Sequence, residues 1–402
     1  MSDKSVSSPQ NRLYFLTFVH LVVDSYATVL PHLLPLLLTK LASQTVARNS
    51  LAGLLISVYS TFSAFNQVIF GWLADRVRTV HFLTLGVVFS AVSLSLLGVV
   101  PSLFLLMLFL VIGGAGVAAF HPQATAQAAT LARQGRGFGV SLFLTGGNVG
   151  RAIGPLAIMY LLVYRYGLES MVWCMIPGLF VAFLVPKILG PGKRIETLKS
   201  PMPAQEVIEA GKRRNLWQAL RPHLYTILVL YLIAVLRTVT TVGLENFLSL
   251  YLDERQYSNL ARSGVIALFI FAGSVGIMIG GSLSDRVDRY RLLLFSLLGA
   301  PPLLYASLHS TGGLFLVLLF IGNFILSSSI TVNIVLTQQL LSEHESIASS
   351  LMMGAAWGVG GLLNIPVGML ADRFGLSNLL DGLAMLPLAT SILVIFLKRA
   401  QR

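Results

Sequence analysis

Long apolar runs recur from one end of this 402-residue chain to the other, and they constrain the fold more than any other feature. Many run for about 18 residues or more, enough to cross roughly 30 Å of hydrocarbon as a helix. No water reaches that depth to satisfy backbone groups, so segments this long and this apolar must be helical. Strands of a membrane barrel would be shorter and would alternate apolar with polar residues. The sequence therefore predicts an all-α, polytopic membrane protein.

The apolar runs predict twelve transmembrane helices in two bundles of six. In order, the predicted helices cover residues 13–38, 50–73, 79–99, 103–131, 137–163, 170–189, 223–251, 263–283, 291–309, 312–341, 346–370 and 377–397. We expect an N-terminal bundle at 1–189, a linker at 190–222 and a C-terminal bundle at 223–402. The linker is the one long polar segment of the chain. It carries six Lys and Arg residues between positions 193 and 214, which predicts that it is cytoplasmic.

The basic residues predict the orientation of the chain. Of its 28 Lys and Arg residues, 20 fall in the linker, in the terminal segments or in loops on the same predicted side of the membrane. By the positive-inside rule, both termini are cytoplasmic. The net charge of +12 does not indicate nucleic-acid binding, because no basic patch with interleaved aromatic residues stands apart from these loops.

Several other functions are excluded by missing motifs. The single cysteine, Cys174, allows neither a disulfide framework nor a thiolate metal site. No phosphate-binding loop, local metal-ligand spacing or nucleophile motif occurs along the chain. We therefore expect no cofactor, no metal and no enzymatic activity.

An internal repeat relates the two halves. Gly71–Val77 (GWLADRV) follows the second predicted helix, and Gly281–Val287 (GSLSDRV) follows the eighth. Arg-aromatic-Gly also occurs twice, at 165–167 and at 373–375. Duplicated halves with a substrate site between them are typical of secondary transporters.

The repeated G-x-L-x-D-R loop resembles the signature loop of the major facilitator superfamily, and the twelve-helix plan agrees with it. The resemblance implies two latches at helix ends that stabilise one transport state without touching substrate. Their residues are Gly71, Asp75 and Arg76 in the first half and Gly281, Asp285 and Arg286 in the second.

Three further motifs resemble the fosmidomycin-resistance branch of that superfamily. They are His20-x-x-x-Asp24, Phe120-His121-Pro122, and a glycine-rich element formed by Gly146, Gly147, Asn148, Gly150, Gly154 and Pro155. The resemblance implies a proton-driven drug exporter of the bacterial inner membrane, with the glycine-rich helix in packing and gating. Small residues at this spacing let two helices approach closely. The chain departs from that branch at Gln123, Ala126 and Arg151, where the family has an acidic, a basic and a small residue.

The ionisable residues inside predicted helices are candidate site residues, because charged groups at that depth are unfavourable without a function. Asp24 lies about 16 Å into the first helix, near the midplane, with His20 one turn earlier on the same face. His121 precedes Pro122, which is expected to break or kink its helix and direct the imidazole into a cavity. Arg151 also lies at mid-depth, where it can pair with Asp24 or attract an anion.

Three further polar residues extend the candidate site. Gln123 offers a neutral donor and acceptor for substrate contact. Arg237 in the seventh helix is a cavity candidate that adds positive potential from the second half. Glu245 lies about 12 Å further along that helix, too far to pair with Arg237, and is either a gate residue or a solvated helix end.

These features predict a transporter that works by alternating access and exports a small organic compound in exchange for protons. In this hypothesis Asp24 carries the proton, while His20, His121 and Arg151 set its affinity and contact the substrate. The expected partners are the substrate, protons and the lipid bilayer, and we expect a monomer. Two alternatives remain open: an importer or uniporter of an anionic metabolite, and a non-transporting membrane sensor or lipid-handling protein.

Overall fold

A computed structural model of the protein describes its helices in detail. The described residues are 8–41, 47–77, 81–131, 136–190, 216–284, 286–342, 347–348 and 351–399. Throughout these ranges the regular structure is helical and no strand occurs. The predicted all-α class is thereby confirmed.

Contacts divide the chain into two units. Unit 1 comprises Met1–Ile195, Glu245–Phe271 and Leu362–Leu376, and unit 2 comprises Glu196–Leu244, Ala272–Gly361 and Ser377–Arg402. Unit 1 therefore contains the whole N-terminal half together with the end of one long helix, the start of another and a short helix from the C-terminal half.

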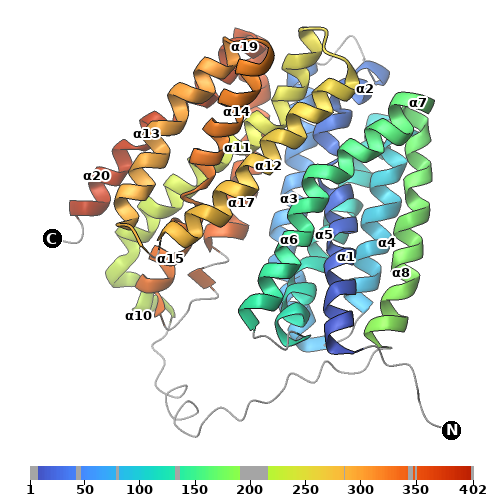
Figure 1. Ribbon diagram of the computed structural model, residues 1–402, viewed down its shortest axis with the longest axis horizontal. Helices are drawn as coiled ribbons and strands as arrows, with labels where there is room; N and C mark the ends of the chain where they lie inside the picture. The colour runs from blue at the N-terminus through green and yellow to red at the C-terminus, as the bar shows by residue number, and fades with distance from the viewer. Residues whose placement is uncertain are drawn as a thin grey trace, which may run out of the picture. The chain divides into compact units, whose positions relative to one another are not determined.

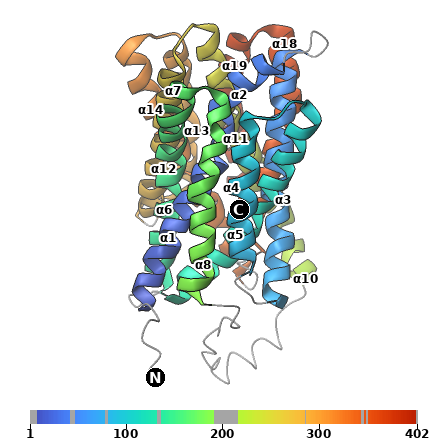
Figure 2. The ribbon, with the colours of Figure 1, turned by 90° about the vertical axis from the view of Figure 1, so that its right-hand side faces the viewer.

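The N-terminal part of unit 1 is a set of long helices that lie side by side (Figure 1). Its elements are α1 (Pro9–Ala27), α2 (Leu30–Lys40), α3 (Arg48–Val77), α4 (His81–Ser95), η1 (Leu96–Gly98), α5 (Leu103–Leu131), α6 (Arg136–Ile158), η2 (Met159–Val163), α7 (Tyr164–Tyr166), η3 (Leu168–Cys174) and α8 (Met175–Leu189). Helix α4 packs against both α5 and α8, as Figure 2 shows, and α1 packs against α6.

The remaining elements run from residue 216 to residue 399. They are α10 (Leu216–Leu220), η4 (Arg221–His223), α11 (Leu224–Glu254), α12 (Asn259–Ser284), α13 (Arg289–Leu308), α14 (Gly312–Ser327), α15 (Ile330–Leu340), η6 (Leu351–Ala355), α17 (Ala356–Leu362), α18 (Asn364–Phe374), α19 (Leu376–Thr390) and α20 (Ile392–Arg399). In unit 2, α13 packs against α14.

Nearly every predicted helix corresponds to a helical segment long enough to cross a membrane. Within the described ranges, eleven helical segments are long and apolar enough to cross a bilayer. The 30-residue helix α3 brings the number of long helical segments to twelve. The first predicted span is two helices, because α1 ends at Ala27 and α2 begins at Leu30, immediately before Pro31.

Helix α5 corrects one expectation, because it continues through Pro122 without a break. Proline removes a single backbone donor, and the neighbouring turns keep their own hydrogen bonds. Two side chains add bonds across the same turns. The His121 ring bonds the carbonyl of Val117 at 2.8 Å, and the Thr125 hydroxyl donates to the carbonyl of His121 at 2.8 Å.

Glycines bring α6 into close contact with α1. A Cβ added at Gly150 would overlap the backbone carbonyl of Leu21, and one added at Gly154 would overlap the side chain of Ser25. The Ser25 hydroxyl also lies 3.3 Å from the carbonyl of Gly150. The glycine-rich element thus lets two helix backbones approach as closely as small-residue packing in membranes allows.

Within unit 1, the start of α3 packs against α18. Asp372 accepts hydrogen bonds from the backbone N–H groups of Asn49 (3.0 Å) and Ser50 (2.6 Å), which are donors that a helix start leaves unsatisfied. Nearby, Asp253 pairs with Arg48 at 2.6 Å and also with Arg262. A carboxylate from each of two C-terminal helices therefore binds the start of α3.

The predicted latches lie partly outside the described residues. Gly71, Asp75 and Arg76 belong to the last turns of α3, Gly281 lies in α12, and Arg286 is exposed just beyond it. Asp285 and linker residues 191–215 lie outside the described ranges. Latching stays a prediction, as does the linker's place between two bundles.

Candidate functional site

Helices α1 and α5 bring three of the predicted site residues together. In this triad, the Nε2 atom of His20 lies 3.3 Å from Asp24 Oδ2, and the Nε2 atom of His121 lies 3.1 Å from Asp24 Oδ1. The two Nε2 atoms are 3.2 Å apart. The side chains of His20 and Asp24 are buried, whereas that of His121 remains 22% exposed. The triad is therefore a compact, largely buried cluster with one accessible member.

Backbone carbonyls fix the tautomers of both rings. The Nδ1 atom of His20 lies 2.7 Å from the carbonyl of Phe143, and the Nδ1 atom of His121 lies 2.8 Å from that of Val117. A carbonyl oxygen only accepts, so each Nδ1 carries a proton and donates it. In the neutral form of each imidazole, Nε2 then holds a lone pair.

This assignment means that the triad needs a cation. Without one, two imidazole lone pairs and a carboxylate would face one another at 3.1–3.3 Å with no hydrogen between them. Three acceptors at hydrogen-bonding distance repel, and burial strengthens the repulsion. One or more protons, or a metal ion, must therefore accompany this arrangement.

Helix α6 shapes the wall against which the triad packs. The ring of Phe143 stacks on that of His20, with centroids 3.8 Å apart and planes 15° apart. A Cβ at Gly147 would lie 2.5 Å from His20 Nε2 and 2.7 Å from Asp24 Oδ2. Gly147, expected only to pack or gate, leaves the space that the triad occupies. The sequence carries no signal that Phe143 supplies the orienting carbonyl.

Arg151 pairs with Glu245 rather than with Asp24. Its Nη2 atom lies 3.7 Å from Glu245 Oε2, and both groups are partly buried within unit 1. Sequence reasoning weighed Glu245 only against Arg237 and therefore missed this pair. The charge of Arg151 also interacts with His121. The charges of Asp24 and Arg151 both interact with Tyr59 in α3.

Removing either partner of this pair is expected to destabilise the protein more than removing both. Arg151→Gln or Glu245→Gln leaves a partly buried charge without its counterion. In a double-mutant cycle on melting in detergent, we expect a coupling of about 0.5–3 kcal/mol. Lys40 and Glu169 are a matched control: they are also 3.7 Å apart, but Glu169 is 79% exposed. Coupling there should be close to zero, and equal coupling in both cycles would contradict the expectation.

The two remaining candidate site residues, Gln123 and Arg237, belong to different helices and different units. Gln123 is buried in α5. Arg237 is buried in α11, in unit 2, where it donates to the Ser329 hydroxyl at 3.1 Å. Ser329 is in turn 2.6 Å from the hydroxyl of Ser296. Arg237 is thus a buried cation that donates to one hydroxyl group, which a second hydroxyl group orients.

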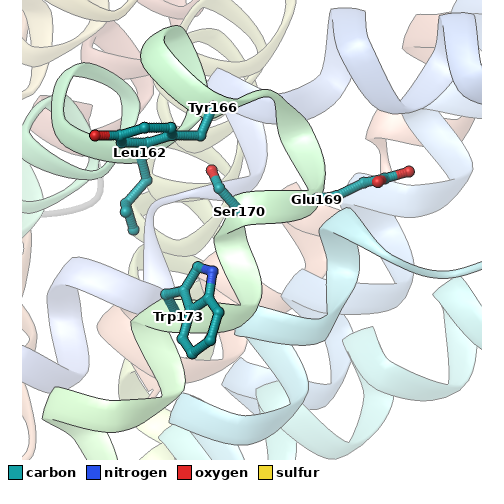
Figure 3. Close-up of a pocket in the computed structure, with 5 residues that line it drawn as sticks. All are labelled: Leu162, Tyr166, Glu169, Ser170 and Trp173. Atoms are coloured by element: carbon teal, nitrogen blue, oxygen red, sulfur yellow. The ribbon is translucent and has the colours of Figure 1, made fainter.

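A pocket elsewhere in unit 1 does not belong to the triad. Figure 3 shows its lining residues, which are Leu162, Tyr166, Glu169, Ser170 and Trp173. Tyr166 and Trp173 are largely exposed. Exposed Tyr and Trp side chains at helix ends are typical of the membrane interface.

Most of the chain matches a known protein family. The family described as Major Facilitator Superfamily matches residues 13–363. The chain belongs to this superfamily. It is therefore a multi-pass membrane protein and a secondary transporter of small molecules, not an enzyme, and the predicted twelve-helix fold is confirmed.

Two curated relatives are similar to the chain over nearly its whole length. The chain is 26% identical over 393 residues to the fosmidomycin resistance protein of Escherichia coli (strain K12), covering 94% of this chain and 90% of that protein. It is also 26% identical to YfnC of Bacillus subtilis (strain 168), an uncharacterised transporter of the superfamily, over 96% of this chain and 94% of that protein.

Solved structures share the fold. A bacterial homologue of the human lysosomal transporter Spinster, in an inward-facing state, aligns with a TM-score of 0.74 at 16% identity, covering 99% of this chain and 97% of that one. The D-xylose-proton symporter aligns with a TM-score of 0.73 at 16% identity, covering 96% and 97% of the two chains. At such identities the likeness concerns architecture alone.

Proposed function

We propose that this superfamily member exports a small organic compound from the bacterial cytoplasm in exchange for protons, by alternating access. The observation that carries the proposal is the meeting of His20, Asp24 and His121, which together form a buried group that must hold a cation. The relative named for fosmidomycin resistance supports drug efflux as the physiological role. In the transport cycle, Asp24 accepts and releases the proton, and the two histidines set how tightly it is held.

In unit 1, cargo contacts are assigned to the polar residues around the triad. Arg151 and Gln123 lie on the helices that carry or flank the triad, and Arg237 supplies a buried positive charge in unit 2. The glycine-rich part of α6 and the two Asp-Arg sequence motifs act in packing and gating. Both termini are cytoplasmic in this proposal, since 20 of the 28 basic residues lie on their predicted side. The protein works as a monomer.

Transport in proteoliposomes tests the proposal. A thermal-shift screen of the purified protein first identifies a compound that binds, because binding to the native state raises its apparent stability. Flux of that compound is then measured with and without an imposed pH gradient. We expect an outward-directed proton gradient to move the compound inward, and a protonophore to abolish this. Flux that ignores the gradient would instead indicate a uniporter, and co-directional flux of compound and protons an importer.

A further inference from the structure

We propose that His20, Asp24 and His121 form a binding site for a divalent transition-metal ion of the zinc type. The inference goes beyond transport, because it concerns a second cation for the triad and does not depend on protons driving the cycle. The three residues offer ligand atoms that all lie within 4.8 Å of one another.

The distances within the triad match a metal coordination shell. Two ligand atoms about 2.0–2.1 Å from a tetrahedral Zn²⁺ lie about 3.3–3.4 Å from each other. The two Nε2 atoms are 3.2 Å apart, and each faces a different oxygen of Asp24, His121 Nε2 at 3.1 Å from Oδ1 and His20 Nε2 at 3.3 Å from Oδ2. An ion between the two rings and the carboxylate would therefore contact both Nε2 atoms and one or both oxygens of Asp24.

Protons can bond each Nε2 to Asp24, but they leave the short approach of the two Nε2 atoms without a bond between them. Each Nε2 has a single in-plane lobe, either a lone pair or an N–H, and so makes one linear hydrogen bond. Yet each Nε2 has two short contacts, one to Asp24 and one to the other imidazole. A central cation uses each lobe once and accounts for all three separations.

The surroundings of the two rings match those of metal-binding histidines. A histidine that ligates a metal usually donates its other N–H to a carbonyl or carboxylate, which fixes the tautomer and ring orientation. Phe143 and Val117 supply such carbonyls to His20 and His121. Both rings therefore present Nε2 in the form that binds a metal.

The donor set also selects the kind of ion. Two imidazoles and one carboxylate suit zinc and its first-row neighbours, whereas Mg²⁺ and Ca²⁺ prefer oxygen ligands alone. Three protein ligands leave a fourth position open, as in zinc sites that bind a further ligand. His121 has the most exposed side chain of the three, at 22%, and we expect the ion to enter beside it. The local sequence spacing hid this donor set, because His20 and His121 are 101 positions apart.

Metal binding to the purified, tag-free transporter tests the inference. After chelator treatment, Zn²⁺ bound at equilibrium is measured for the native chain, Asp24→Asn, His121→Gln and His309→Gln. His309 is the matched control, since its Nε2 lies 3.5 Å from Asp381 Oδ2 and no second histidine joins this pair among the described residues. We expect about one Zn²⁺ per native chain and unchanged binding in His309→Gln. In Asp24→Asn and His121→Gln, we expect the affinity for Zn²⁺ to fall by more than the roughly 10–100-fold that changes in outer-shell residues cause.

Two further measurements cover variants that fold poorly. The native protein loaded with Co²⁺ should show the visible absorption of a four-coordinate nitrogen and oxygen site. Zn²⁺ should also bind more weakly as the pH falls, because protons compete for Nε2 and the carboxylate. Binding that survives the triad substitutions, that is lost equally in His309→Gln, or that gives no such Co²⁺ spectrum overturns the site. These outcomes are independent of proton-coupled flux, so the transport proposal can stand or fall separately.

Discussion

Asp24→Asn is expected to reduce substrate-driven proton movement in proteoliposomes to the level of protein-free liposomes. The asparagine amide has nearly the size of the carboxylate, but it neither binds nor releases a proton near neutral pH. It also removes the negative charge that the two imidazoles share, which lies 3.1–3.3 Å from their Nε2 atoms. Because the triad is the proposed proton carrier, flux of the compound should no longer respond to a pH gradient.

The control for this variant is Asp381→Asn. Asp381 also faces a histidine, His309, but the two form a more exposed pair in unit 2. Its removal should leave substrate-driven proton movement intact. Thermal shifts with the transported compound separate coupling from binding, since a variant that still binds will still be stabilised. Unchanged proton movement in Asp24→Asn would remove Asp24 from the mechanism.

Long apolar runs made most of the fold predictable, because length and apolarity decide whether a segment crosses a membrane. The predicted helix 103–131 coincides with α5, Leu103–Leu131. Hydropathy does not report local backbone geometry, so the predicted helix 312–341 is two helices, α14 and α15, that meet at Ser328 and Ser329. The break expected at Pro122 is wrong for a related reason: one missing donor does not end a helix whose other turns are bonded.

The candidate site was predictable only as far as helical periodicity reaches. The spacing of His20 and Asp24 placed both on one face of one helix, and they lie 3.3 Å apart. That His121 completes the cluster depends on how α5 packs against α1, which a single sequence does not encode locally. The same holds for Glu245, which lies on α11 but pairs with Arg151 on α6. The depth of these residues in the predicted helices identified them as candidates, whereas the packing of the helices decides which of them pair.

Gly150→Ala is expected to lower the melting temperature of the protein sharply and to impair transport with it. The added methyl group would overlap the carbonyl oxygen of Leu21. A backbone atom within a helix cannot move aside as the end of a flexible side chain can, so α1 and α6 must separate. Overpacking of this kind typically costs about 1–3 kcal/mol. Since α1 carries His20 and Asp24, separation also disturbs the triad that packs against Gly147 on α6.

A glycine in open surroundings separates this steric effect from the effect of adding a methyl group to a helix. Gly382 lies in α19, where an added Cβ would meet nothing within 4 Å. Alanine favours helix over glycine by roughly 0.8–1.0 kcal/mol, so Gly382→Ala should keep or raise the melting temperature. If Gly150→Ala behaved like Gly382→Ala, the close contact between α1 and α6 would not contribute to stability. Opposite shifts from the same chemical change would mean that packing against α1, not helix propensity, requires glycine at position 150.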